Sequence, residues 1–376
     1  MALRKISDCN IAGRRVLVRA DLNVPLADGV PRDEYRLRAL IPTLQHLQQQ
    51  QASRIIIATH IGNPAPGSTD PAYSTQNLMP WFQAQGFGDV QMLENVRLSA
   101  GEKKGDIAFA RQLAELADVY VNDAFGALHR ADTSLTLLPQ QFAPADRCIG
   151  LCVQREMQEL DALKTSAQQP FVLVMGGAKA KDKIPLLQHF FQQPPANRPQ
   201  VCIVGGMLAQ ACLGLGTALD TATIRSAQQL GTTAQKNNVR LVLPVDFAVI
   251  DGPVGSPAKI VPVAKIQPLQ QCVDIGPDSI QLFIESLEGV KTVFTNGTMG
   301  MYEQEDYAQG TKALLGAIAA ISGHTVVGGG DTVAAVHHFA LEDRISFIST
   351  GGGATLAYLG SADPLHDLPG LRALLD

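Results

Sequence analysis

The chain has 376 residues, and the usual size of domains makes two the natural expectation, each long enough to bury a core of its own. Its composition, with 46% hydrophobic and 17% charged residues, 34 glycines and 22 prolines, is that of a globular protein with many tight turns. The formal net charge of −5 excludes the broad basic surface of a nucleic-acid binder, although local groups of Arg and Lys could still hold a small anion.

The cysteines and the chain start indicate a reducing compartment. The six cysteines form no CxxC pair and have no zinc-site spacing, which favours buried free thiols. The N-terminal segment MALRKISDCNIAGRR has no apolar stretch before its charges, and no apolar run is long enough to span a bilayer. We therefore expect a cytoplasmic protein with neither a membrane nor a nucleic acid as partner.

Short apolar runs recur along the chain, each ending in polar residues or glycine. Such runs are typical of buried parallel strands, and they fall at 16–18, 55–58, 119–121, 171–175, 201–204, 241–243, 292–294, 325–327 and 345–348. Segments with helical spacing, such as 107–117 and 312–321, lie between them. This alternation predicts an α/β fold of doubly wound parallel sheets.

A charged amphipathic helix followed by a polar, proline-terminated segment occupies 152–169 and marks the predicted junction between two Rossmann-like lobes. The first lobe is expected at 1–151 and the second at 170–360, with a C-terminal tail at 361–376 that could return to the first lobe. Ligands of open α/β sheets bind beyond the carboxyl ends of the strands. We therefore expect one ligand-binding edge in each lobe.

The strand ends of the first lobe carry acidic, amide and basic side chains. Asp21 and Asn23 follow the run at 16–18, and His60 follows the run at 55–58. Small basic groups recur in YRLRAL, LENVRL and ALHRADTS, which contain Arg36, Arg97 and Arg130 respectively. Most exposed arginines only solvate a surface, but arginines near several strand ends could converge on a phosphorylated substrate because the guanidinium group binds phosphate bidentately.

The strand ends of the second lobe are rich in glycine. VMGGAKAKDKI places two glycines and then Lys179 and Lys183 at the start of a predicted helix, where backbone N–H groups and cations could hold phosphate oxygens; a plain turn with solvated lysines is the alternative. Triple-glycine turns occur in VVGGGDT and ISTGGGAT. Asp331 follows the first of them and could be a helix cap or could hold a magnesium ion that bridges nucleotide phosphates.

Ten segments in order resemble the phosphoglycerate kinase family from near residue 15 to near residue 360. They are VRADLNVPL, YRLRALIPTL, LENVRL, VNDAFGALHRADTS, GGAKAKDKI, LPVDF, DIGP, NGTMGMYE, VVGGGDT and ISTGGGAT. The resemblance implies two lobes joined by a hinge helix. It also implies magnesium-dependent phosphoryl transfer between 1,3-bisphosphoglycerate and ADP, giving 3-phosphoglycerate and ATP in glycolysis or gluconeogenesis, by a monomer whose partners are these small molecules.

The same resemblance assigns roles to individual residues. The catalytic set would be Arg36, Lys179, Lys183, Gly352 and Gly353. The acid substrate would contact Asp21, Asn23, Arg36, His60, Asn63, Arg97 and Arg130. The nucleotide would contact Lys179, Lys183, Gly205, Gly206, Glu303, Gly329, Gly330, Asp331 and Thr332, and Asp331 would hold Mg²⁺.

Several positions depart from the family pattern. HIGNP puts Asn63 where an arginine that binds the substrate phosphate is expected, and TNGT puts Thr295 and Thr298 in place of an aromatic residue and a proline. Lys181 stands where a small residue is usual. Two alternatives therefore stay open: a paralogue with altered acid specificity, and a nucleotide-binding module that has lost catalysis. A binding module would not need Arg36, Lys179, Lys183 and Asp331 together.

Overall fold

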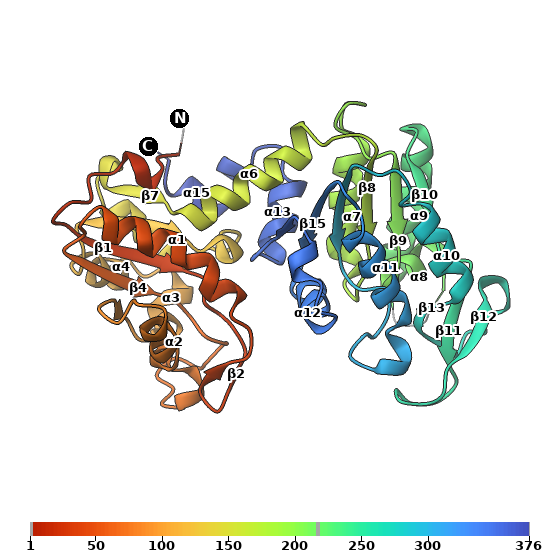
Figure 1. Cartoon of the computed structure of the whole chain (residues 1–376), viewed down its shortest axis with the longest axis horizontal. Coiled ribbons are helices and arrows are strands. Elements are labelled where there is room, and N and C mark those ends of the chain that lie inside the picture. The colour runs from red at the N-terminus through yellow and green to blue at the C-terminus, as the bar shows by residue number, and fades with distance from the viewer. Residues whose placement is uncertain (1–2, 216–218, 376) are drawn as a thin grey trace. The chain divides into compact units, whose positions relative to one another are not determined.

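The computed structural model describes residues 3–215 and 219–375, and the chain divides into two compact units. Unit 1 comprises Met1–Gln158 with Ser361–Asp376, and unit 2 comprises Glu159–Gly360. Helix α6 (Leu151–Thr165) begins in unit 1 and ends in unit 2 (Figure 1), and all of it except Leu151 falls in the segment 152–169 expected as the hinge.

The sheet of unit 1 is parallel throughout, with the strand order β5–β4–β1–β6–β7. Its strands are β1 (Arg15–Ala20), β4 (Arg54–Ala58), β5 (Gln91–Met92), β6 (Val119–Asp123) and β7 (Arg147–Ile149). A short antiparallel hairpin, β2 (Leu26–Ala27) with β3 (Val30–Pro31), follows β1. The helices are α1 (Tyr35–Gln49), α2 (Met79–Ala84), α3 (Ala100–Lys104), α4 (Ile107–Ala114), α5 (Thr133–Thr136), α14 (Pro364–Asp367) and α15 (Pro369–Arg372).

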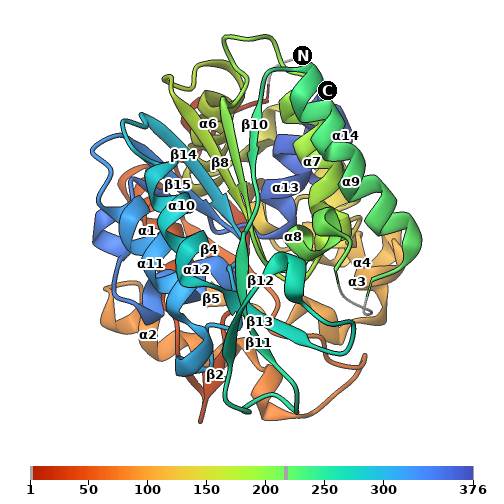
Figure 2. The same ribbon diagram turned by 90° about the vertical axis from the view of Figure 1, so that its right-hand side faces the viewer.

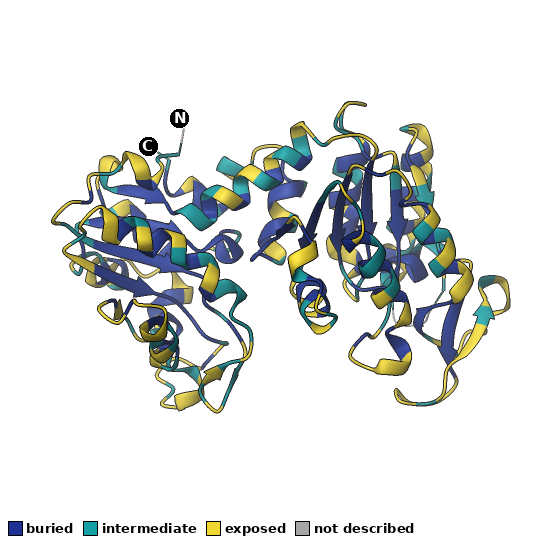
Figure 3. Cartoon of the chain, in the orientation of Figure 1, coloured by how far each residue is buried: buried dark blue, intermediate teal, exposed yellow. Residues whose placement is uncertain are grey.

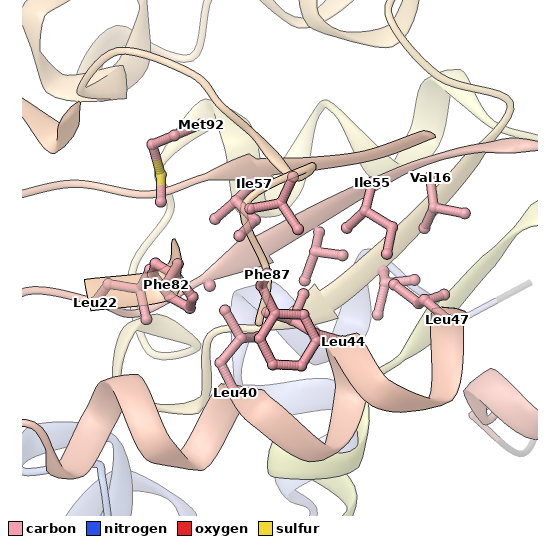
Figure 4. Packing of buried hydrophobic residues seen from close by; sticks show 14 of the residues in the cluster. Val16, Leu22, Leu40, Leu44, Leu47, Ile55, Ile57, Phe82, Phe87 and Met92 are labelled. Carbon is pink, nitrogen blue, oxygen red and sulfur yellow. The ribbon is translucent and has the colours of Figure 1, made fainter. Parts of the chain in front are cut away.

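The core of unit 1 forms where α1 covers the central strands (Figure 4). Leu37, Leu40, Leu44 and Leu47 are spaced three or four residues apart, so they share the face of α1 that is buried against the sheet. Val16 of β1 pairs in register with Ile55 of β4 and Val119 of β6. Each fully buried aliphatic side chain contributes about 1.5–3 kcal/mol, so this cluster stabilises the edge that carries the predicted acid-binding residues.

The C-terminal tail at 361–376 packs on unit 1. The backbone N–H of Gly370 donates to the carbonyl of Leu128 at 2.9 Å, and the guanidinium of Arg147 donates to the carbonyl of Leu375 at 2.7 Å. The tail therefore belongs to the same compact unit as the first 158 residues.

The main sheet of unit 2 is also parallel, with the order β10–β9–β8–β14–β15–β16. Its strands are β8 (Phe171–Met175), β9 (Val201–Val204), β10 (Arg240–Val242), β14 (Thr292–Asn296), β15 (His324–Gly328) and β16 (Phe347–Ile348), and the central ones are buried on both faces (Figure 3). The helices are α7 (Ala180–Phe191), α8 (Gly206–Leu213), α9 (Thr221–Lys236), α10 (Pro277–Glu285), α11 (Gln309–Ala319), α12 (Gly330–His338) and α13 (Gly353–Gly360).

An antiparallel sheet in unit 2 adds to the predicted parallel architecture. It has the order β12–β11–β13 and consists of β11 (Asp246–Ile250), β12 (Lys259–Pro262) and β13 (Gln271–Ile275). Figure 2 shows these strands beyond the ends of β8 and β10. The two α/β units with parallel sheets confirm the predicted fold class, and this smaller sheet is an element that the strand–helix alternation did not indicate.

No helix among the described residues is both long enough and apolar enough to cross a bilayer. All six cysteines are described and none forms a disulfide; Cys148 and Cys202 are buried, and the other four are partly exposed.

Candidate active site

A cluster of predicted acid-binding residues begins directly after β1 in unit 1. Oδ2 of Asp21 accepts from the Arg36 guanidinium at 3.0 Å, and Arg36 also donates to the carbonyl of Asn23 at 3.3 Å. Burial alone would raise the pKa of Asp21, but the positive charges of Arg36 and Arg19 and the nearby His60 outweigh burial and hold this pKa below its usual value. Asp21 therefore stays ionised and fixes the orientation of Arg36.

His60 lies after β4 and is buried beside Arg19. Its Nδ1 is 3.4 Å from a guanidinium nitrogen of Arg19, and since arginine can only donate, Nδ1 is the acceptor and Nε2 carries the proton. Burial, reinforced by Arg19, Arg130 and Arg36, lowers the pKa of His60 to about 3 despite the opposing effect of Asp21. Nε2 is buried and has no partner among the described residues. The His60 ring is thus neutral, and its Nε2–H can donate a hydrogen bond to a ligand.

The loop after His60 is held from two sides. The backbone N–H of Gly62 donates to Oδ1 of Asn23 at 2.8 Å, while the guanidinium of Arg97 donates to the carbonyl of Gly62 at 2.6 Å. Arg97 lies on the 3₁₀ turn Val96–Leu98 and is 3.8 Å from the carboxylate of Asp132, yet its Nε has no partner among the described residues. Arg97 is therefore anchored and keeps one buried donor available.

Arg130 and Asn63 complete the predicted acid-binding set. Arg130 is partly exposed and close enough to His60 to lower the pKa of that ring. Asn63 is exposed and accepts a hydrogen bond from Nζ of Lys103, a residue that the sequence analysis did not select. Hydrogen bonds or electrostatic interactions thus link Asp21 with Arg36 and His60, His60 with Arg130, and Asn23 with Arg97 through Gly62, and Asn63 is the next residue after Gly62.

In unit 2, three glycine turns contact one another at the carboxyl ends of β8, β9 and β14. They contain Gly176 and Gly177, Gly205 and Gly206, and Gly297, and we call their contact the glycine crossing. The N–H of Gly177 donates to the carbonyl of Thr298 at 2.6 Å, and the N–H of Met207 donates to the carbonyl of Gly177 at 3.1 Å. Gly297 has a φ of +95°, and a Cβ there would overlap the carbonyl of Gly176. A side chain at Gly206 would likewise overlap the backbone of Gly177, so this crossing requires glycine.

A hollow of about 540 Å³ opens beside the crossing, a volume within the usual range of small-molecule sites. Three of the predicted nucleotide-binding residues line it: Gly206, Glu303 and Asp331. The walls also include 268–273, Met207, Gln210 and 298–301. Apolar side chains such as Leu269, Met299 and Met301 next to carboxylates suit a ligand with a flat apolar part and a polar part.

Lys183 lies beside the Gly177 turn and interacts electrostatically with Asp331. A Cβ at position 177 would lie 3.3 Å from Nζ of Lys183. Burial lowers the pKa of Lys183, Lys179 lowers it further, and the carboxylates of Asp182 and Asp331 oppose this. The three predicted charged residues are therefore electrostatic neighbours, with Lys179 exposed just before α7 and Asp331 exposed in the first turn of α12.

The remaining predicted residues of unit 2 border these three. Gly205 precedes α8 and donates to the carbonyl of Met175 at 2.8 Å. The second triple-glycine turn lies beside the first, since a Cβ on Gly352 would be 3.5 Å from the nitrogen of Gly330, and Gly353 begins α13. Thr332 is buried, and its hydroxyl accepts from the N–H of Gly297 at 2.6 Å, so it ties the turn before α12 to the glycine crossing.

Sequence reasoning missed the wall at 268–273 and the contact of Lys103 with Asn63. The wall comes from β13 and the segment before it. A signal for it exists: DFAVI, KIVPV and QCVDI follow one another with no helical segment between them, which is typical of antiparallel strands. No comparable signal links residues 63 and 103.

The fold and the two candidate sites define an α/β protein with a cluster of cations and hydrogen-bond donors in one unit and a hollow beside glycine turns in the other. The profile of the family described as "Phosphoglycerate kinase" matches residues 6–85 and 73–361. The chain belongs to the phosphoglycerate kinase family.

Individual relatives agree along the whole length. The chain is 38% identical over 407 residues to the phosphoglycerate kinase of Pelotomaculum thermopropionicum and 37% identical over 403 residues to that of Thermomicrobium roseum, with both chains covered completely in each case. Among solved structures, the phosphoglycerate kinase of Coxiella burnetii superposes with a TM-score of 0.82 at 30% identity, and that of Pyrococcus horikoshii with 0.80 at 25% identity. Each alignment covers 99% of this chain and 98% of the solved one.

Proposed function

We propose that this chain is a phosphoglycerate kinase that catalyses reversible transfer of a phosphoryl group between 1,3-bisphosphoglycerate and ADP, giving 3-phosphoglycerate and ATP in glycolysis or gluconeogenesis. The proposal rests on the match of the chain to the family along its length. The candidate sites of the two units, the donor cluster and the hollow, support it. Unit 1 offers donors and cations for an acidic, phosphorylated substrate, and unit 2 offers a hollow for a nucleotide.

The acid substrate would be held by the cluster in unit 1. The carboxylate of Asp21 and the amide of Asn23 can receive a hydroxyl group, whereas Arg97, Arg130, His60 and Asn63 present donors to anionic oxygens. Arg36, held by Asp21 and still partly exposed, is proposed as the catalytic arginine. Its guanidinium would neutralise charge on the oxygens of the moving phosphoryl group.

The nucleotide would bind at the glycine turns of unit 2. Gly205, Gly206, Gly329, Gly330 and Thr332 would shape its site, and Glu303 would contact the ribose from the wall of the hollow. Lys179 and Lys183 would hold the phosphates and the moving phosphoryl group. Gly352 and Gly353 would offer N–H groups at the start of α13. Because acyl phosphates hydrolyse readily, the residues that surround the phosphates must also exclude water.

Magnesium fits the residues present. No group of three or more His, Cys, Asp or Glu that could hold a metal occurs in the described residues, and Mg²⁺ bound with nucleotides takes one or two carboxylates plus phosphate oxygens. Asp331, an exposed carboxylate on the wall of the hollow, would be that ligand. Bound there, the ion would neutralise phosphate charge. We also propose that the enzyme works as a cytoplasmic monomer with only these small molecules as partners, as the family resemblance implies.

One assay separates the candidate functions: 3-phosphoglycerate with ATP, coupled to consumption of the acyl phosphate, with and without Mg²⁺. Magnesium-dependent turnover supports the proposal. Absence of turnover, together with normal ATP binding, would favour the inactive nucleotide-binding module, and turnover of a different acid would favour a paralogue.

The role of Asp331 is tested by Asp331→Asn, which removes the charge with little change of shape. We expect lower turnover and half-maximal activity at a Mg²⁺ concentration raised by about tenfold, because a charged oxygen ligand is lost. Asp343→Asn, an exposed aspartate elsewhere in unit 2, serves as the control. If the magnesium titrations of both variants overlay the wild type, Asp331 is only a residue of the first helical turn.

A further inference from the structure

A lysine on α3 reaches the predicted acid-binding cluster from outside the selected residues. Nζ of Lys103 donates to Oδ1 of Asn63, and both side chains are exposed. Asn63 itself carries no charge. The contact therefore places a full positive charge beside the loop 60–63, which carries none of its own because His60 is neutral.

The short helix α3 holds Lys103 in this place. Its neighbour Glu102 is fully buried and accepts from both the hydroxyl and the backbone N–H of Ser134, at 2.6 and 3.0 Å, and lies 3.8 Å from Arg19. The hydroxyl of Thr133 also donates to the carbonyl of Gly101 at 2.7 Å. Because Gly101 and Glu102 are held in the core, the backbone position of Lys103 is fixed and only its exposed side chain can move.

The loop that Lys103 contacts is fixed to the same cluster. Gly62, next to Asn63, is held by Asn23 on its N–H and by Arg97 on its carbonyl. Lys103 therefore joins a continuous set of contacts with Arg97, Asn63 and Asn23. Its ammonium group has three donors and uses one on Asn63, which leaves two free.

The side-chain atoms near this loop that lack a hydrogen-bond partner among the described residues include two nitrogen donors. Nε of Arg97 and Nε2 of His60 are buried without partners among the described residues, and Nζ of Lys103 is held at Asn63, next to the Gly62 carbonyl that accepts from Arg97. Donors on two cations and on a neutral ring suit a dianion with three acceptor oxygens better than a carboxylate with two.

We propose that Lys103 binds the phosphate group of the acid substrate, beside Asn63 and Arg97, and so contributes to the affinity for 3-phosphoglycerate. This inference rests on the proposed function and names a ligand for the same site. Lysine acts there as a flexible point charge rather than a bidentate group, so it strengthens binding of the phosphate without fixing its orientation.

The test compares Lys103→Gln with Lys104→Gln, the adjacent exposed lysine of α3. Glutamine can still donate to Asn63, so only the charge is removed. By titration calorimetry of the full chain, we expect the Kd for 3-phosphoglycerate to rise about tenfold in Lys103→Gln, with a weaker dependence on salt, and to stay within about twofold of wild type in Lys104→Gln. The Kd for ATP should change in neither variant, and Lys103→Arg should retain most of the affinity.

Two further measurements separate a phosphate contact from a structural role. Glycerate, which lacks the phosphate, should bind equally to wild type and to Lys103→Gln. The thermal unfolding temperatures should also match, because the side chain is exposed. Equal affinities of Lys103→Gln and Lys104→Gln for 3-phosphoglycerate would overturn the inference. Because binding needs no turnover, a chain that binds 3-phosphoglycerate without converting it contradicts the proposed function while the same comparison still decides the role of Lys103.

Discussion

At the scale of single residues, burial and neighbouring charge decide what each predicted side chain can do. His60 lies among arginines in the interior, and its pKa of about 3 keeps it neutral throughout the physiological range. Its contribution is therefore a hydrogen bond to an anion rather than a charge. The positive charge of the cluster comes instead from Arg36, Arg97, Arg130 and, by our inference, Lys103.

The first prediction concerns Lys179, which is exposed beside the glycine turn of β8 and α7. Lys179→Ala should lower kcat by about two orders of magnitude or more, the scale for removing one group that stabilises a transition state, and should leave the fold intact. Lys181→Ala, in the first turn of α7 two residues further on and also exposed, should change kcat by less than about threefold. Steady-state kinetics and circular dichroism of both variants check this, and near-normal turnover of Lys179→Ala would contradict the proposed role.

The residue types of the site could be predicted because they follow buried strands, whose carboxyl ends are readable from the sequence. Asp21, His60, Lys183 and Asp331 were all selected in this way. Their pairings could not be predicted, since each depends on tertiary contact. Lys103 meets Asn63 from forty residues further along the chain, and no periodic pattern connects the two.

At the scale of elements, the start of α6 is built around a buried carboxyl group. Oδ1 of Asp123, at the end of β6, accepts from the N–H of Val153 at 3.1 Å, and a Cβ at Gly150 would overlap this carboxyl. Burial raises the pKa of Asp123 to about 7, although hydrogen bonds from Thr43, Val153 and Cys152 lower it. The first turn of the helix therefore rests on a group that titrates near neutral pH.

The second prediction follows from this pKa. The unfolded chain ionises Asp123 near pH 3.8 and the folded chain near pH 7, so the folded state binds more protons between these values. The free energy of unfolding contributed by Asp123 should thus fall as pH rises from about 4 to about 7, by up to about 4 kcal/mol. Asp123→Asn cannot ionise and should lack this fall.

Urea unfolding of the wild type and Asp123→Asn at pH 4.5, 6 and 8 provides the measurement. The wild-type midpoint should decline relative to that of the variant across the series. Asp274, whose pKa is likewise raised to about 7 by burial, is present in both proteins and cancels in the difference. Parallel midpoints at all three pH values would show that Asp123 is ionised in the folded state throughout.

The third prediction concerns the glycine crossing in unit 2. Gly297→Ala should destabilise the chain by about 3 kcal/mol or more, because the new Cβ meets both a positive φ and the backbone of Gly176. Gly255→Ala is the matched control: Gly255 has a φ of +99° but nothing within 4 Å of its Cβ position, so only the conformational cost of about 1 kcal/mol remains. Equal urea midpoints of the two variants would mean that the crossing relaxes without cost.

Strands were predictable where the sequence has a continuous apolar run. The predicted strands 171–175 and 201–204 coincide with β8 and β9, since each is such a run. The strands β5 and β7 begin with the polar residues Gln91 and Arg147 and leave no such run, whereas the equally short β16 lies in the predicted run 345–348. The strands β11 to β13 were missed because the prediction relied on strands that alternate with helices, whereas these three follow one another without an α-helix between them.

At the scale of the whole molecule, our proposal places the binding sites of the two substrates in different units. The cluster around Asn23, His60 and Arg97 belongs to unit 1, whereas the hollow with Glu303 and Asp331 belongs to unit 2. Sites without shared partners respond independently to substitution. Changes in the first unit should therefore alter binding of the acid and leave binding of the nucleotide unaffected.

The last prediction uses Asn63, the clearest departure from the family pattern. Asn63→Arg would add a charge-assisted and potentially bidentate donor to the acid-binding cluster, and such contacts contribute about 1.5–3 kcal/mol. The KM for 3-phosphoglycerate should fall by about tenfold or more, while the KM for ATP stays within about twofold, because the nucleotide hollow lies in the other unit. Turnover at saturation should change less than the KM for the acid.

If Lys103 already supplies charge beside position 63, the gain in affinity from Asn63→Arg should be larger in the Lys103→Gln background than in the wild type, since the new guanidinium would not face a neighbouring cation. Steady-state kinetics of the four proteins in this cycle decide the matter. An acid KM that does not fall in either background would mean that position 63 does not face the phosphate, and a matching change in the KM for ATP would contradict the separation of the two sites.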